Sequence, residues 1–425
     1  MRDKPPLKNS DVIYNLCREA RTASHALAQN RSEGINAALY QIAANIRNSK
    51  SHLLEENKRD LVSAKSRKLH PSKIDRLTLN EKRLEAMAAG CETVAELDDP
   101  FGEVLEHWHR DNGLEITRVS VPIGVLGMIY EARPNVTVDA AAIALKSRNA
   151  IIMRGGSEMY YTAAALHDLI QNALQAYDMP VAAVAMVPST DRALVGRMLQ
   201  AHEAIDLIIP RGGRGLVERV MQEACMPVLA HLDGLCHVFV HESADPDIAR
   251  TIVSNAKMRR TGICGAAETL LLDRNLNNDT AGHILRDLLR SGCAVCGDEH
   301  ACQFDNRITR AHEEDWRTEY LDAKISVRFV EDTNEAIGHI NHYGSHHTDS
   351  IVCQDEETKT LFYDRVDSAI VMHNASTQFA DGGEFGMGAE IGIATGKVHA
   401  RGPVGIRQLM TYKYIIEGNG NTRPA

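Results

Sequence analysis

The stretch "GVLGMIYEARPNVTVDAAAIALKSRNAIIMRGGSE", residues 124–158, decides the fold. Its two strand candidates, "GVLGMIY" (124–130) and "AIIMRGG" (150–156), have the length and composition of buried strands. Between them, "VDAAAIALKSR" (138–148) carries apolar side chains at helical spacing. A strand–helix–strand order of this kind is typical of a mostly parallel sheet covered by helices on both faces.

The alternation continues in both directions along the chain. "VAAVAMVP" (181–188) and "IDLIIPRGG" (205–213) are further strand candidates, each followed by a helical pattern. A second α/β stretch covers roughly 239–381, and residues 9–98 are mainly helical in pattern. We therefore expect an α/β protein with two parallel-sheet domains.

A β-hairpin interrupts this order. Residues 103–122, "EVLEHWHRDNGLEITRVSVP", place an Asp-Asn-Gly turn between alternating segments. The tail "IRQLMTYKYIIEG" (406–418) alternates again and could pair with the hairpin, within one chain or across subunits. Because projecting strands leave unpaired edges, we expect this element to form the interface of a homo-oligomer.

Composition narrows the class of protein. The 425 residues exceed a typical single core, so two or three domains are expected. The net charge of −10 argues against binding to nucleic acid or to an anionic membrane. Nine scattered cysteines indicate a reducing compartment, and no apolar run reaches the roughly 18 residues of a membrane span. We expect a cytoplasmic protein.

One cysteine has the surroundings of a nucleophile. Cys264 lies in "NAKMRRTGICGAAETLLL" (255–272), between two glycines and after the cations Lys257, Arg259 and Arg260. Nearby cations favour a thiolate, and glycines allow backbone N–H groups to approach a carbonyl. The alternative is a small buried hydrophobe, which is the commoner fate of a free cysteine.

Two glycine-rich turns are candidates for a nucleotide site. "RGGSE" (154–158) and "PRGGRG" (210–215) both follow a strand and precede a helix, where backbone N–H groups bind phosphate. Each could equally be an ordinary turn, and neither matches G-x-G-x-x-G or a Walker loop. Asn135 could donate a hydrogen bond to an oxyanion or could cap a helix.

No metal site is expected. Cys293, Cys296 and Cys302 contain one C-x₂-C pair, but zinc needs four ligands and no second pair stands at usable spacing. None of the nineteen histidines stands in an H-E-x-x-H pattern.

Several stretches together resemble the γ-glutamyl phosphate reductase (glutamate-5-semialdehyde dehydrogenase) family, which is similar in fold to the aldehyde dehydrogenases. They run in family order over about 100–415, and "YEARPNVT" (130–137) with "HARGP" (399–403) is highly specific. The resemblance implies three parts of an aldehyde dehydrogenase-like α/β fold. They are a cofactor domain at 1–238 interrupted by the hairpin at 102–120, a catalytic domain at 239–381, and a return segment with an oligomerisation strand at 382–425.

The resemblance also implies roles for individual residues. Cys264 would be the nucleophile and Asn135 an oxyanion donor. The cofactor phosphates would be contacted by Arg154, Ser157, Gly212 and Gly213, and the nicotinamide ribose by Glu319. The substrate and its phosphate would be contacted by Lys257, Arg260 and Arg133. This chain departs from the family pattern around the cysteine, because Thr261-Gly262-Ile263-Cys264-Gly265 stands where the family often has Pro-Ser-Thr-Cys-Asn.

The implied activity is the NADPH-dependent reduction of L-glutamyl 5-phosphate, in proline biosynthesis from glutamate. The products are L-glutamate 5-semialdehyde and phosphate, and glutamate 5-kinase is a candidate partner. The alternative is a hydrolytic NAD(P)-dependent aldehyde dehydrogenase, which needs a carboxylate base to activate water. In "LAHLDGLCHVFV" (229–240) the only candidate base is Asp233.

Overall fold

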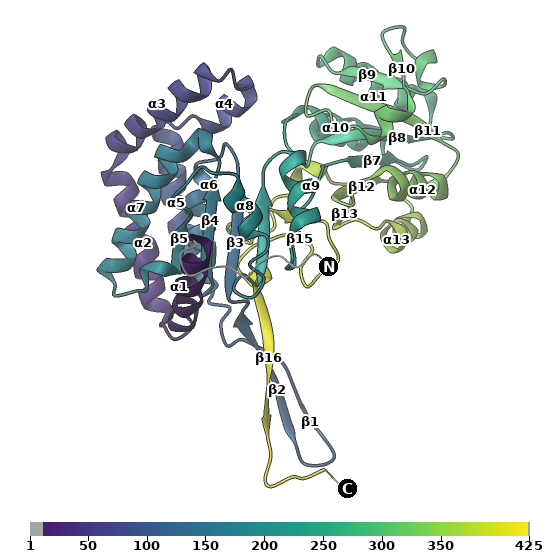
Figure 1. The fold of residues 1–425 in the computed structure, drawn as a ribbon. Coiled ribbons are helices and arrows are strands. Elements are labelled where there is room, and N and C mark those ends of the chain that lie inside the picture. The colour runs from purple at the N-terminus through teal and green to yellow at the C-terminus, as the bar shows by residue number, and fades with distance from the viewer. Residues whose placement is uncertain (1–11, 424–425) are drawn as a thin grey trace. The chain divides into compact units, whose positions relative to one another are not determined.

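The computed structural model describes the backbone of residues 12–423, which divide into two compact units (Figure 1). Unit 1 comprises residues 12–230, 387–392 and 404–423, and unit 2 comprises His231–Gly386 and Ile393–Pro403. Unit 2 begins at His231, and the main chain at Gly234 packs on Cys264. The described part of the segment 382–425 is divided between the two units, and the expected functional domains stay a prediction.

Unit 1 begins with helices from Val12 onward, as predicted; residues 9–11 of the predicted helical range lie outside the described residues. In α2 every third or fourth side chain is apolar and buried, as Ile35, Leu39 and Ile42 illustrate, and α2 packs against α5 and α7. The five helices are α1 (Val12–Leu27), α2 (Ser32–Asn48), α3 (Lys50–Ser66), α4 (Pro71–Leu77) and α5 (Glu81–Glu96).

A four-stranded parallel sheet follows in unit 1, and its order is β5-β4-β3-β6. Its strands are β3 (Val125–Tyr130), β4 (Ala150–Gly155), β5 (Val184–Met186) and β6 (Leu207–Arg211). Its helices are α6 (Asn135–Lys146), α7 (Tyr160–Ala176), α8 (Ala193–Met198) and α9 (Arg214–Glu223). The chain adds β4 and β5 on one side of β3 and then returns to place β6 on the other side. The strand order therefore reverses between β3 and β6, which is where open α/β sheets bind their ligands.

Unit 2 is built on a seven-stranded parallel sheet with the order β10-β9-β11-β8-β7-β12-β13. Its strands are β7 (Cys236–Val240), β8 (Ala267–Asp273), β9 (Ala294–Gly297), β10 (Thr309–Arg310), β11 (Lys324–Val330), β12 (Thr348–Val352) and β13 (Ile370–His373). Its helices are α10 (Pro246–Met258), α11 (Asn278–Arg290), α12 (Thr333–Tyr343) and α13 (Glu356–Arg365). A short antiparallel pair, β14 (Ile393–Ala394) with β15 (Gly402–Pro403), belongs to the same unit.

The predicted hairpin and tail form a three-stranded antiparallel arm on unit 1 (Figure 1). It consists of β1 (Val104–His109), β2 (Glu115–Pro122) and β16 (Met410–Glu417). The hairpin turn places Gly113 at φ +84°, a conformation that favours glycine. β16 pairs with β2 of its own chain, from Met410 opposite Pro122 to Glu417 opposite Glu115. The expected pairing is confirmed, and it takes place within one chain.

Within the described residues, no helix combines the length and the apolar character that crossing a bilayer requires.

Candidate active-site residues in the two units

The four residues expected at the cofactor phosphates lie at one edge of the unit 1 sheet. Arg154 is near the carboxyl end of β4, and Ser157 starts the short helix η1 (Ser157–Met159) directly after it. Gly212 and Gly213 connect the carboxyl end of β6 to α9. Because these strands are parallel and flank β3, the two turns lie on either side of the β3–β6 switch point. Both glycine-rich stretches are therefore strand-to-helix turns, as predicted.

Hydrogen bonds tie the turn after β3 to its neighbours. The Glu158 carboxylate accepts a hydrogen bond from the Ala132 N–H at 2.7 Å. The Glu131 N–H donates to the Arg211 carbonyl oxygen at 2.9 Å. Ala132 has a φ of +47°, which is strained for a residue with a side chain and is common near functional sites. These contacts fix the backbone that leads into Asn135.

The side chains around the β4 turn fit an anionic group. Arg154 is buried; its Nη2 donates to the Thr190 carbonyl oxygen at 2.9 Å, and its buried Nε has no hydrogen-bond partner among the described residues. Arg67 Nη1 donates to Ser157 Oγ at 3.2 Å, which brings a second guanidinium to the same turn. A buried donor without an acceptor and a second cation suit the phosphates of a dinucleotide.

Asn135 is the first residue of α6 and is exposed. The residue at the helix cap position is Pro134, so the capping alternative for Asn135 is wrong. Asn135 Nδ2 donates to Asp139 Oδ2 at 2.8 Å, which orients the amide and leaves its second N–H available. Burial raises the pKa of Asp139 to about 6, and the hydrogen bond from Asn135 partly offsets this effect. Arg133, half-buried, is part of the same turn.

In unit 2, Cys264 lies half-buried in a tight turn just before β8. The Ala266 N–H donates to the Ile263 carbonyl oxygen at 3.0 Å and closes this turn. The Cys236 thiol donates to the Cys264 carbonyl oxygen at 3.0 Å. Burial raises the pKa of Cys236 well above its usual range, so Cys236 stays protonated and keeps this hydrogen bond.

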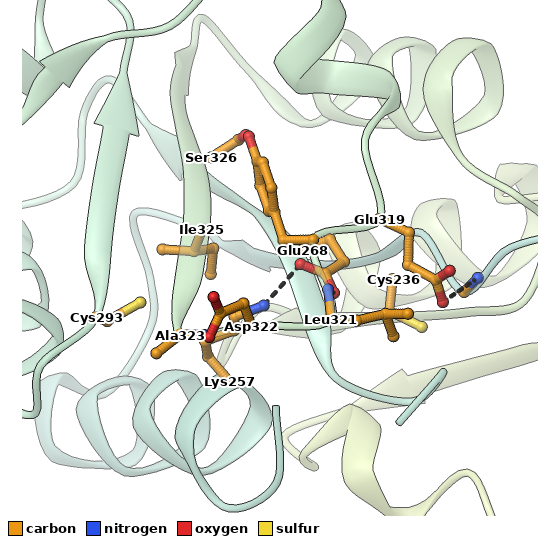
Figure 2. A network of polar contacts seen from close by, with 12 residues as sticks. Cys236, Lys257, Glu268, Cys293, Glu319, Leu321, Asp322, Ala323, Ile325 and Ser326 are labelled. Atoms are coloured by element: carbon orange, nitrogen blue, oxygen red, sulfur yellow. Dashed lines mark hydrogen bonds and ion pairs between the residues drawn. The ribbon is translucent and has the colours of Figure 1, made fainter. Parts of the chain in front are cut away.

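The main chain at Gly234 packs directly on the cysteine. A Cβ at position 234 would lie 2.3 Å from the Cys264 carbonyl oxygen and 2.7 Å from its Cβ, so only glycine fits there. The Glu319 carboxylate accepts a hydrogen bond from the Gly234 N–H at 2.9 Å (Figure 2). Glu319 therefore helps to hold the segment that contacts Cys264, and its expected contact with the nicotinamide ribose stays a prediction.

Lys257 does not present its charge to solvent. Its side chain is fully buried in unit 2, and Nζ lies 2.6 Å from Glu268 Oε2 (Figure 2). The other oxygen of Glu268 accepts a hydrogen bond from the Leu321 N–H at 3.3 Å, where Leu321 has a φ of +52°. In this structure its ammonium neutralises Glu268, and the expected contact of Lys257 with the substrate stays a prediction. Arg260, beyond the end of α10, is exposed.

Two histidines that no sequence motif marks lie beside the cysteine. Ring nitrogens of His231 and His347 and the Sγ of Cys264 all lie within 4.8 Å of one another. The three residues are far apart in the sequence and share no motif; their common feature is a place just before a buried strand. Asp233, the candidate base of the hydrolytic alternative, lies before β7 and not within it.

The fold and the cysteine turn together define an aldehyde dehydrogenase-like protein, and the comparisons agree. The model of the aldehyde dehydrogenase family matches residues 4–289. The chain therefore belongs to the aldehyde dehydrogenase family, and within it to the γ-glutamyl phosphate reductases.

The assignment to the γ-glutamyl phosphate reductases rests on similarity over nearly the whole chain. A γ-glutamyl phosphate reductase of Brucella suis is 51% identical over 415 residues, which are 97% of this chain and 99% of the relative. One of Rhodospirillum rubrum is 49% identical over the full length of both chains. The crystal structure of γ-glutamyl phosphate reductase from Thermotoga maritima superposes with a TM-score of 0.95 at 42% identity, over 97% of this chain and all of that one.

Proposed function

We propose that this chain reduces L-glutamyl 5-phosphate to L-glutamate 5-semialdehyde with NADPH and releases phosphate, in proline biosynthesis from glutamate. The observation that carries the proposal is the similarity to γ-glutamyl phosphate reductases over nearly the whole of both chains. The relatives are named as reductases of an acyl phosphate, so a hydrolytic aldehyde dehydrogenase is not favoured.

Cys264 is the nucleophile of this reaction. Its thiolate attacks the carbonyl carbon of the acyl phosphate, the bond to the phosphate oxygen breaks, and a thioester forms as inorganic phosphate leaves. The half-buried turn gives the sulfur access to the substrate, while the hydrogen bond from Cys236 fixes the turn's backbone.

Asn135 and the Cys264 N–H stabilise the oxyanion that forms in each half of the reaction. Asp139 orients the Asn135 amide through its hydrogen bond, which limits the reorganisation needed when charge develops. Arg133 and Arg260 supply positive charge for the substrate and the departing phosphate.

Arg154, Ser157, Gly212 and Gly213 bind the phosphates of the cofactor, and Glu319 faces its ribose. When bound, NADPH supplies the hydride that reduces the thioester. The unit 1 residues orient that cofactor through the buried guanidinium of Arg154 and the backbone N–H groups at the start of α9. Collapse of the hemithioacetal then returns the thiolate of Cys264 and releases the aldehyde.

The chain works as a cytoplasmic homo-oligomer that assembles through the arm, with glutamate 5-kinase as a candidate partner. Support for assembly comes from the arm itself, whose strands β1 and β16 expose apolar side chains. Those side chains are Val104, Leu105, Tyr412, Tyr414, Ile415 and Ile416.

The test is the reaction run in the oxidising direction. Release of a thioester to water needs a base that activates the water, which is worth about 10²–10⁴-fold. We expect reduction of NADP⁺ by glutamate 5-semialdehyde to require inorganic phosphate or arsenate. A full rate in phosphate-free buffer that falls in Asp233→Asn would instead indicate a hydrolytic dehydrogenase.

A further inference from the structure

We propose that Cys264, His231 and His347 form a binding site for a zinc ion, and that the bound ion blocks the nucleophile. The sulfur and the two imidazole nitrogens lie within 4.8 Å of one another. All three residues belong to unit 2, so one folded unit supplies the whole donor set.

The fold brings these residues together at one edge of the unit 2 sheet. β7 lies between β8 and β12, and all three strands are parallel. The strands start level with one another, because Cys236 pairs with Ala267 and His237 pairs with Asp349. His231, Cys264 and His347 each precede one of these three strands. Their approach therefore follows from the register of the sheet.

His231 is oriented as a metal ligand would be. Its Nδ1 lies 2.7 Å from the carbonyl oxygen of Ile393. A carbonyl oxygen only accepts hydrogen bonds, so Nδ1 carries the proton and Nε2 of the neutral ring keeps its lone pair. Histidines that bind metals usually donate their other ring N–H to such a carbonyl or carboxylate, which fixes the ring.

His347, the third member of the cluster, is also held by its neighbours. It is fully buried, and its Nδ1 lies 2.8 Å from Thr348 Oγ1. Its ring meets the His231 ring edge to face, with the centroids 5.2 Å apart. Both imidazoles are thus fixed by neighbours before any ion arrives, which lowers the entropy lost on binding.

The donor set selects the kind of ion. One thiolate and two imidazoles suit Zn²⁺, whereas Mg²⁺ and Ca²⁺ prefer oxygen ligands. Three protein ligands leave a fourth tetrahedral position for water. Tetrahedral zinc would bring the donor atoms to roughly 3.3–3.7 Å from one another, so donor atoms as far apart as 4.8 Å would have to approach each other by up to about 1.5 Å.

Binding has two chemical consequences. The thiol must lose its proton, so zinc binding releases a proton and weakens as the pH falls. The sulfur lone pair that would attack the acyl phosphate is then committed to the metal. This inhibitory part rests on the proposed function of Cys264, whereas the binding part does not.

Cobalt(II) is the probe, because a thiolate ligand gives it a charge-transfer band and a tetrahedral site gives it intense d–d bands. We expect one equivalent of Co²⁺ to produce both in the reduced full-length protein, and Zn²⁺ to displace it. His231→Ala and His347→Gln should weaken binding by at least about 100-fold, since even an outer partner of a metal ligand is worth about 10–100-fold. Cys264→Ser should abolish the charge-transfer band.

The chain offers a matched control in the arm. Among the described residues, the other group with metal-ligand spacing is His107, His109 and Glu115, which is largely exposed. The double variant His107→Ala/His109→Ala removes that group and should keep the full cobalt spectrum.

The outcomes separate the two claims. An unchanged cobalt spectrum in His231→Ala, or a spectrum lost only in the arm variant, would overturn the proposed site. Because His231 is only half-buried, the His231→Ala variant decides the question if His347→Gln fails to fold. Zinc that binds with the expected variant pattern but leaves turnover unchanged would keep the site and refute the role of Cys264 as the nucleophile.

Discussion

Cys264 and Cys225 are both free cysteines with access to solvent, and they offer a direct comparison. We expect Cys264→Ser to keep the fold and cofactor binding but to lose nearly all turnover, because an unactivated hydroxyl is a poor nucleophile. Cys225→Ser, on the surface of unit 1, should retain activity. Measured kcat values decide the point, and a Cys264→Ser rate within about tenfold of wild type would contradict the assignment.

Asn135 is predicted to act on the transition state. Asn135→Ala should lower kcat by about 10²–10³-fold, the usual cost of one oxyanion donor. Asn135→Asp, which keeps the shape but removes the N–H donors, should be equally impaired. A rise in KM with unchanged kcat would show instead that Asn135 binds substrate in the ground state.

Asp139 makes stability depend on pH. Burial raises its pKa from 3.8 to about 6, so the folded state binds the proton more tightly than the unfolded chain does. The stabilisation present below pH 3.8 is therefore lost as the pH rises through 6. Asp139→Asn should gain stability relative to wild type over that range, by about 1–3 kcal/mol. Urea unfolding at several pH values measures this difference, and a constant difference would contradict it.

At the scale of secondary structure, the Lys257–Glu268 pair joins α10 and β8 to the loop at Leu321. Lys257→Met should cost about 3–5 kcal/mol of unfolding free energy, because it leaves a carboxylate buried without its partner. The double variant Lys257→Met/Glu268→Leu should recover most of this loss. Lys359→Met, which breaks the exposed pair with Glu356, should change the unfolding free energy far less. Equal losses of unfolding free energy in the single and the double variant would show that the unpaired carboxylate of Glu268 does not cause the destabilisation.

The arm is predicted to form the interface of the homo-oligomer. Ile416 on β16 is 59% exposed, and Val62 on α3 is 63% exposed. We expect Ile416→Lys to shift the protein to a smaller species in analytical ultracentrifugation, while Val62→Lys leaves the assembly unchanged. A wild-type monomer at micromolar concentration would contradict the proposed interface.

Sequence periodicity predicted the strands and helices of unit 1 well because it reflects local burial. β3 and β4 are buried on both faces and appear as short apolar runs, and the helices of unit 1 show their buried stripe directly. β5 is shorter than the run at 181–188 because the chain forms a 3-10 turn at Val181–Ala183 first. Such turns depend on tertiary contacts rather than on periodicity.

At the scale of the whole molecule, prediction was weakest where residues distant in sequence meet. Cations near Cys264 in the sequence suggested substrate contacts, yet Lys257 points into the core because Glu268 is its partner. His231 and His347 were missed because only the register of three parallel strands brings them together. No local pattern links His231 and Gly234 to the cysteine turn either, although both lie beside it in unit 2.

The arm also has a consequence for how the chain is made. β2 pairs with β16, so one edge of β2 stays unpaired until β16 leaves the ribosome, long after Pro122 has done so. At ordinary rates of synthesis the delay from Pro122 to Met410 is roughly 15–60 s. During that time the nascent chain exposes a strand edge that can pair with another chain. Correct completion of the arm therefore requires that this edge of β2 stay unpaired until β16 has been synthesised.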